Sequence, residues 1–232
     1  PHRQLKGTHM SKKYDALGID IGGSGIKGAP VDLTKGAFAE DRLRIATPER
    51  STPDAVCDVV EQVVDHFDVK KGVPVGITVP AAVTHGVVRT SANIDSSWIG
   101  TDAASLFADR LGREVHVVND ADAAGVAERY YGAAKGHDGV VVLTTLGTGI
   151  GTALLVDGHL VPNTELGHLE IDGHDAETKA ADSAREREGL VIEEWAERLQ
   201  TYYSRLESLQ WPDLFVVGGG VSKRASEFLP LL

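Results

Sequence analysis

Cysteine is almost absent from this sequence, because Cys57 is the single cysteine among 232 residues. A lone cysteine excludes an internal disulfide and a zinc site built from several cysteine thiolates. Such low cysteine usage is typical of a reducing compartment, so we expect a cytoplasmic protein.

Long apolar runs and an excess of positive charge are missing as well. No stretch reaches the roughly 20 apolar residues that span a bilayer as a helix, so no membrane partner is expected. The formal net charge of −11 argues against a nonspecific nucleic-acid-binding protein, although a local basic groove for a polyanion stays open. Residues 1–10, PHRQLKGTHM, lack the apolar segment of a signal peptide and are interpreted as a cloning remnant.

Apolar residues and glycines are what the sequence does contain. A hydrophobic content of 42% suits one large or two modest domains with a genuine core. The 26 glycines gather partly in three turns, and these turns organise the rest of the interpretation.

The first glycine cluster, in LGIDIGGSGIKGAPVD at positions 17–32, matches the spacing of a dinucleotide-binding turn. That motif requires a helix after the glycines, whereas residues 26–33 alternate in the manner of a strand and Pro30 would break a helix. No Gly-Lys-Ser/Thr follows, which excludes a P-loop. The stretch therefore predicts a hairpin of strands 14–20 and 27–33.

The turn of this hairpin could bind phosphate. The turn consists of Gly22, Gly23, Ser24 and Gly25. Because these residues have small side chains or none, several backbone N–H groups are exposed and form a nest for anions. The alternative is a turn that is rich in glycine for its geometry alone.

A second strand, glycine turn and strand follow at positions 140–160, VVVLTTLGTGIGTALLVDGHL. The repetition of one plan more than a hundred residues apart predicts two related halves, each with a phosphate-binding turn. Its turn contains Gly147, Thr148 and Gly149. A third glycine turn, residues 218–220, follows a strand at 214–217 and opens a helix near Ser222; tight packing of strand on helix is its alternative explanation.

Helices and strands alternate between these turns. Thr52 and Pro53 predict the start of a helix that ends near Val69. The segments 73–80 and 113–120 predict strands, and the segments 102–111 and 121–131 predict helices. This order predicts an α/β fold with a largely parallel sheet component.

Five motifs in a fixed order resemble the ROK sugar kinases: DIGGSGIKG, VVNDADAAGVAE, LGTGIG, ELGH and VVGGGVS. The resemblance covers residues 14–228 and is most similar to the polyphosphate glucokinase branch, through SANIDSSWIG, ELGHLEIDG and one long charged helix from 177 to 207. It implies the actin-like (ribonuclease H-like) two-lobed fold with duplicated glycine hairpins. It also implies phosphorylation of glucose by inorganic polyphosphate, often with ATP as a second donor.

The sequence departs from most ROK proteins in two places. No cysteine follows His168, where most members carry a zinc-binding cysteine cluster, so we expect no zinc. The resemblance also leads us to expect a further strand and helix after position 232, so that either the sequence is incomplete or the closing element is lost.

The resemblance makes Asp120 the general base for the sugar 6-hydroxyl, in agreement with its place between a strand end and a helix start. Without the motifs, an N-cap is the better explanation for such an aspartate. The sugar would be bound by Asn119, Glu165 and His168, with Asn93 and Trp98 in a covering loop. A packing role competes for Trp98.

The donor would be bound by the glycine turns, including Gly219 and Gly220, together with Lys27. Asp20 would hold Mg²⁺, directly or through water, unless it forms an ordinary hairpin ion pair with Lys27. Candidate residues for a polyphosphate track are Lys179, Arg185, Arg187, Lys223 and Arg224. Acidic neighbours make a solvated helix with internal ion pairs an equally good explanation.

We expect two lobes, residues 11–118 and 119–232, hinged near Val118 and closing on the sugar. The family resemblance implies a homodimer. An ATP-dependent ROK kinase for fructose, mannose or an N-acetylhexosamine is one alternative function. The other is a sugar-sensing protein without catalysis. Because the first hairpin begins soon after Met10, we expect no DNA-binding module before it, and we expect no peptide-binding partner domain of the kind that a chaperone-like ATPase needs.

Overall fold

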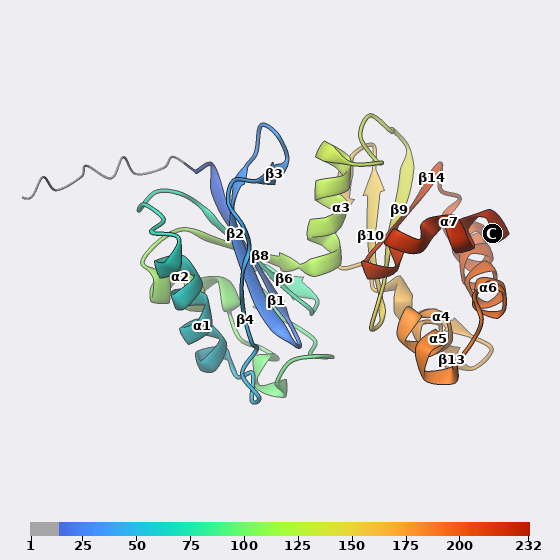
Figure 1. The fold of residues 1–232 in the computed structure, drawn as a ribbon, viewed down its shortest axis with the longest axis horizontal. Helices are drawn as coiled ribbons and strands as arrows, with labels where there is room; N and C mark the ends of the chain where they lie inside the picture. Colours follow the sequence, from blue (N-terminus) through green and yellow to red (C-terminus); the bar gives the residue numbers. More distant parts are fainter. Residues whose placement is uncertain (1–13) are drawn as a thin grey trace, which may run out of the picture.

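The structure, a computed structural model, describes residues 14–232. The expected cloning remnant at residues 1–10 lies outside the described residues. Two sheets occupy the two halves of the molecule, and helix α3 (Asp120–Tyr131) lies between them (Figure 1).

The first sheet is built around the predicted hairpin. Strands β1 (Ala16–Gly22) and β2 (Gly25–Asp32) pair antiparallel, with Gly23 and Ser24 as the turn between them. Strand order is β3-β2-β1-β5-β8, with β4 also paired to β2. The remaining strands are β3 (Ala37–Phe38), β4 (Leu43–Ile45), β5 (Val75–Val79) and β8 (Val115–Asn119), and β1, β5 and β8 run parallel. A separate small hairpin contains β6 (Val83–Thr84) and β7 (Val87–Val88).

The second sheet repeats this plan, as the sequence predicts. Strands β9 (Val140–Leu146) and β10 (Ile150–Val156) form an antiparallel hairpin, and β14 (Leu214–Gly218) pairs parallel to β9. With β11 (His159–Val161) at the edge, the order is β11-β10-β9-β14. This order matches β3-β2-β1-β5 strand for strand.

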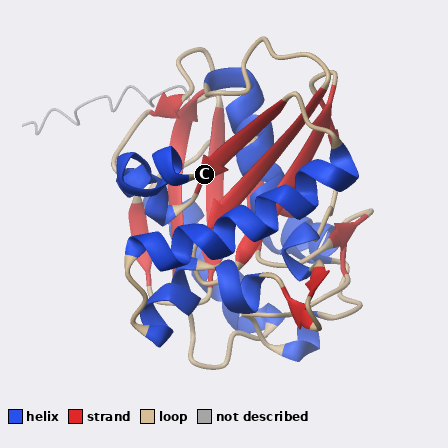
Figure 2. Ribbon diagram, turned by 90° about the vertical axis from the view of Figure 1, so that its right-hand side faces the viewer, coloured by secondary structure: helices blue, strands red, loops and turns tan. Residues whose placement is uncertain are grey.

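Each half has its own apolar core. Helices α1 (Pro53–His66) and α2 (Ala103–Leu111) cover the first sheet, and Thr52 caps α1 as predicted. In the second half, α6 (Ile192–Gln210) lies across the strands (Figure 2). Its buried residues, among them Trp195, Leu199 and Tyr202, pack on the sheet. Among residues 14–232, no helix combines the length and the apolar composition that crossing a membrane requires.

The prediction of one long charged helix is wrong. Residues 177–210 form three helices instead: α4 (Glu177–Ala180), α5 (Asp182–Glu188) and α6. Ala181 is extended and fully buried, and Gly189 ends α5 in the left-handed conformation at φ +66°. The Trp195 indole N–H donates to Ala180 O at 2.9 Å, so packing of α6 on this corner stabilises the break.

Short elements complete the chain. They are the 3₁₀ helices η1 (Ser96–Trp98), η2 (Leu166–His168), η3 (Gly220–Arg224) and η4 (Leu229–Leu231), the hairpin of β12 (Glu170–Ile171) and β13 (His174–Asp175), and helix α7 (Ala225–Phe228). The helix expected near Ser222 thus begins as a 3₁₀ turn and becomes α-helical at Ala225.

Candidate active site

At the junction of β8 and α3, Asn119 and Asp120 have different roles, which the sequence alone does not assign. The Asn119 Oδ1 accepts from the backbone N–H groups of Ala121 at 2.8 Å and Asp122 at 3.0 Å. Asn119 therefore caps α3, and the N-cap explanation for Asp120 is wrong. The Asn119 amide also donates to Ala81 O at 3.1 Å, which leaves one amide hydrogen for a sugar hydroxyl.

Asp120 is the first residue of α3, and its side chain is not needed as a cap. Its Oδ1 accepts from the Ala121 N–H at 2.9 Å, and in the described part of the chain no other residue donates to its second oxygen. The residue is exposed to solvent. Desolvation raises the pKa of the Asp120 carboxyl, and the charges of Asp20 and Glu165 raise it further. These effects make Asp120 a stronger base than an ordinary surface aspartate.

Asp20 lies at the end of the first hairpin and faces Lys27 across it. The Lys27 ammonium donates to Asp20 Oδ2 at 3.2 Å, and the Thr78 hydroxyl donates to Asp20 Oδ1 at 3.0 Å. The hairpin ion pair is thus present. Each carboxylate oxygen still has a lone pair, so Asp20 fits a hydrated Mg²⁺ that takes its other ligands from donor phosphates and water. Residues 14–232 hold no group of three or more His, Cys, Asp or Glu side chains arranged for a metal.

The first glycine turn lies beside the loop that carries Asn93. A Cβ at Gly23 would lie 3.3 Å from Asn93 O, so any larger residue there would push the loop away by a few tenths of an ångström. The backbone N–H groups of Gly23 and Ser24 have no partner within the described residues. They are available to an anion.

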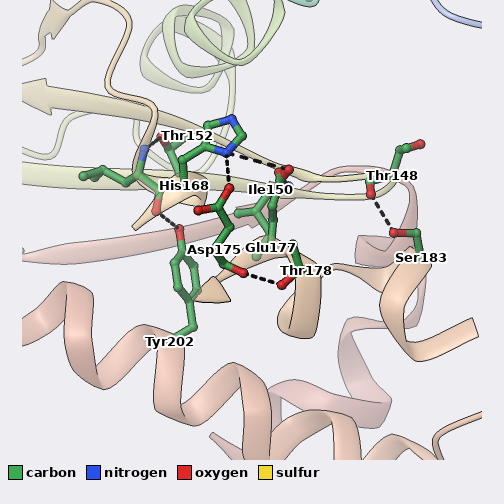
Figure 3. Close-up of polar contacts among 10 residues, drawn as sticks. Thr148, Ile150, Thr152, His168, Asp175, Glu177, Thr178, Ser183 and Tyr202 are labelled. Carbon is green, nitrogen blue, oxygen red and sulfur yellow. Dashed lines mark hydrogen bonds and ion pairs between the residues drawn. The ribbon is translucent and has the colours of Figure 1, made fainter. Parts of the chain in front are cut away.

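The second glycine turn is fixed from behind. The Ser183 hydroxyl donates to Thr148 O at 2.6 Å (Figure 3). The Ser183 N–H donates to Gly147 O at 3.1 Å. The Ile150 N–H donates to the Glu177 carboxylate at 3.0 Å. In residues 14–232 the N–H groups of Thr148 and Gly149 find no acceptor, which leaves them for a phosphate.

The third glycine turn lies next to the second, because β14 runs parallel to β9. Gly219 has φ +84°, and a side chain there would come within 2.5 Å of Leu146 O. Tight packing, the alternative explanation, therefore accounts for Gly219. Nothing lies within 4 Å of the side-chain position of Gly220, which faces open space.

Glu165 precedes η2, His168 is its last residue, and the two side chains have different neighbours. Glu165 lies near α3, where its charge contributes to the raised pKa values of Asp120 and Asp122. The His168 Nδ1 lies 3.2 Å from Asp175 Oδ2 and 3.9 Å from Glu177 Oε1 (Figure 3). Glu177 thus joins His168 to the second glycine turn, a role that sequence reasoning missed because residue 177 was placed on a solvated helix.

Trp98 does not offer its ring to a sugar, and that expectation is wrong. The side chain is 0% exposed, lies 5.9 Å from the Phe107 ring, and donates its indole N–H to Ser51 O at 2.8 Å. The packing explanation holds for Trp98. Asn93 in the same loop is exposed, and its side chain has no hydrogen-bond partner among residues 14–232.

A clamp between the halves, formed by Asp122, Asn163 and Val83, was also missed. The Asp122 carboxylate accepts from the Asn163 N–H at 2.9 Å. The Asn163 side chain accepts from the Val83 N–H at 2.7 Å and donates to Val83 O at 2.8 Å. The clamp ties α3 and the loop before Glu165 to the first half, and nothing in the sequence signals this pairing of residues 80 positions apart.

The predicted polyphosphate track is largely neutralised by acids. Arg185 pairs with Asp182 at 2.7 Å, Arg187 with Glu188 at 3.1 Å, and Arg224 with Glu227 at 2.8 Å. These pairs favour the explanation of a solvated surface with internal ion pairs.

Comparisons with known proteins agree with this geometry. Residues 16–182 match the model of the ROK family. The polyphosphate glucokinase of Mycobacterium tuberculosis strain H37Rv is 49% identical over 217 residues, which cover 93% of this chain and 81% of that protein.

Solved structures show the same likeness. The inorganic polyphosphate/ATP-glucomannokinase of Arthrobacter sp. strain KM superposes with a TM-score of 0.89 at 54% identity, over 95% of this chain and 89% of that one. A ROK family glucokinase from Streptomyces griseus, solved with glucose and AMPPNP, shares the fold with a TM-score of 0.77 at 24% identity, over 93% of this chain and 86% of that one. The expected α/β fold of the actin-like sugar kinases is confirmed.

Proposed function

The chain belongs to the ROK family, and from this premise we propose that it transfers a phosphoryl group from inorganic polyphosphate or ATP to the 6-hydroxyl of glucose. The names of its relatives support the substrates. The observation that carries the chemistry is the second Asp120 oxygen at the start of α3, to which no other described residue donates, in a setting that raises the pKa of the carboxyl.

In this proposal Asp120 accepts the proton of the glucose 6-hydroxyl while the hydroxyl oxygen attacks the terminal phosphorus of the donor. The bond from that phosphorus to the bridging oxygen breaks, and the shortened polyphosphate or ADP leaves. Asn119 fixes the start of α3 and offers its remaining amide hydrogen to the sugar. Glu165, His168 and Asn93 bind ring hydroxyls from the surrounding loops. The positions of Glu177 beside His168 and behind the second turn support a further sugar contact.

The donor lies against the glycine turns, where backbone N–H groups and Lys27 stabilise charge on the transferred group. Residues 22–25, residues 147–149 and Gly220 form this surface, and Gly219 shapes it. Asp20 would hold Mg²⁺, which would neutralise part of the negative charge on the phosphate oxygens and so reduce their repulsion of the incoming hydroxyl oxygen. We propose no zinc.

Two lobes, residues 11–118 and 119–232, would close on the sugar about the segment near Val118. The separate apolar cores of the two sheets support this division. A homodimer and a cytoplasmic location remain predictions, supported by the family resemblance and by the cysteine content.

A panel of sugars tested against both donors checks the proposal. We expect glucose to be phosphorylated with polyphosphate and with ATP, and mannose is included because the Arthrobacter relative is a glucomannokinase. If the protein phosphorylated fructose or an N-acetylhexosamine in preference to glucose, the assignment of glucose as the substrate would be wrong. Sugar binding without turnover of either donor would instead indicate a sugar sensor.

A further inference from the structure

Three charged side chains form a row across the first sheet, next to the first glycine turn. Asp20 of β1 is the register partner of Lys27 of β2, and Lys27 is the register partner of Arg44 of β4. Directly paired residues of antiparallel strands project from the same face of a sheet. The neighbouring pair, Ile26 and Ile45, packs into the apolar core on the other face.

Two cations stand directly opposite each other in this row, an arrangement that destabilises a sheet. Asp20 offsets the charge of Lys27, but Arg44 has no carboxylate partner within residues 14–232. Arg44 differs in this from Arg185, Arg187 and Arg224, whose acidic partners neutralise them. An unneutralised second cation in the row points to an anionic ligand.

Contacts with the turn hold the Arg44 side chain in place. Its Nη2 donates to Ser24 O at 2.7 Å, and the guanidinium lies over Gly25, where a Cβ would come within 2.7 Å of Nε and 2.8 Å of Cζ. Nε and Nη1 keep their hydrogens for another acceptor. The unpartnered N–H groups of Gly23 and Ser24 lie at the same turn.

We propose that Arg44 binds a phosphate of the phosphoryl donor at the first glycine turn. The inference rests on the proposed function and adds a residue to it. A guanidinium pairs with phosphate through parallel N–H bonds, which a lysine cannot reproduce. The backbone N–H groups of the turn supply the remaining donors, and the unfavourable Lys27–Arg44 pairing is relieved when the anion binds.

The test compares Arg44→Gln and Arg44→Lys with Arg42→Gln. Arg42, two positions away, is also exposed, and its Cζ lies 5.5 Å from the centre of the Phe38 ring, so its variant controls for the loss of one surface charge. For Arg44→Gln we expect the KM of the donor to rise about tenfold or more, with the KM of glucose unchanged. Arg44→Lys should fall between it and the wild type, and Arg42→Gln should match the wild type.

Assays with polyphosphate and with ATP identify the phosphate. A rise of KM for both donors assigns Arg44 to a phosphate near the transfer site, and a rise for polyphosphate alone assigns it to the longer chain. An unchanged KM for both donors in folded Arg44→Gln overturns the proposal. An equal rise of the donor KM in Arg42→Gln also overturns it, because the loss of any positive surface charge would then explain the effect. If Arg44→Gln fails to fold, the KM values of Arg44→Lys replace it, and wild-type values for both donors in that variant overturn the proposal.

Calorimetric titration with inorganic tripolyphosphate separates this inference from the proposed function. Weaker binding by Arg44→Gln than by the wild type supports the inference even if no sugar is phosphorylated. Equal binding overturns it even if the wild type proves to be an active glucokinase.

Discussion

Two adjacent residues at the start of α3 divide the work that one aspartate could have done. Asn119 holds the helix start through two bonds to backbone N–H groups, so the Asp120 side chain is not needed as the cap. Asparagine and aspartate are equally good caps, so their order decides which of the two caps the helix, and only the aspartate can accept a proton.

We expect the ionisation of Asp120 to determine how turnover depends on pH. Its pKa is raised, chiefly by desolvation, and only the ionised carboxylate accepts a proton. As the pH falls, kcat/KM for glucose should therefore decline through a pKa above the usual value for aspartate of about 3.9. A pH profile of kcat/KM measures this. An acid limb at or below the usual value would show that the group that titrates is not in this environment.

The roles of single residues could be predicted where a sequence motif contains them, but not where tertiary packing determines whether a side chain is buried. The sequence placed Asp120 correctly between a strand and a helix, because it follows a short apolar run. It ended the first strand at Asp20 and assigned Gly22 and Gly25 to the turn, whereas the strands continue through both glycines. It could not tell a stacking tryptophan from a buried one, since the same loop pattern serves both. Trp98 is buried because Phe107 and the Ser51 carbonyl complete its surroundings from distant positions.

At the scale of elements, the two glycine hairpins were predicted because alternation and turn residues act locally. The segment from 177 to 210 was not, because its break depends on a contact across 15 positions, from Trp195 to Ala180. Helix propensity alone would continue through Ala181, which the tertiary structure instead holds extended.

The clamp of Asp122, Asn163 and Val83 connects elements of both halves. Its member Asn163 lies two positions before Glu165. Asn163→Gly keeps the left-handed backbone, at φ +59°, and removes the two side-chain bonds to Val83. We expect a loss of about 1–3 kcal/mol in the free energy of unfolding and a several-fold rise in the KM of glucose. Denaturant unfolding and steady-state kinetics measure the two effects.

A matched control for this variant is Asp172→Gly, which removes an exposed side chain at φ +51°. It should leave the KM of glucose unchanged. If Asn163→Gly loses stability while its KM for glucose stays at the wild-type value, the clamp is a structural tie without influence on the sugar site.

At the scale of the whole molecule, the repeated strand order explains why one ligand could meet two glycine turns. Each half contributes a hairpin beside a parallel strand, and α3 lies between the sheets. Besides the clamp, the Tyr131 hydroxyl donates to Leu33 O at 2.7 Å and so joins the far end of α3 to the first half. The sequence predicted the duplication but not these contacts between the halves.

Closure of the proposed lobes should be visible in solution. If glucose draws the halves together, the radius of gyration decreases when the sugar is saturating. Small-angle X-ray scattering with and without glucose measures it, with a sugar that the protein does not phosphorylate as the control. An identical radius under both conditions would contradict closure.

The central claim is that Asp120 is the general base, and Asp120→Asn tests it most directly. The amide keeps the shape of the side chain and an oxygen for the Ala121 N–H, but it cannot accept the proton. We expect kcat to fall by about 100- to 10,000-fold while glucose still binds, and Asp109→Asn, an exposed position on α2, to behave as the wild type. A folded Asp120→Asn protein with near-normal kcat would contradict the account.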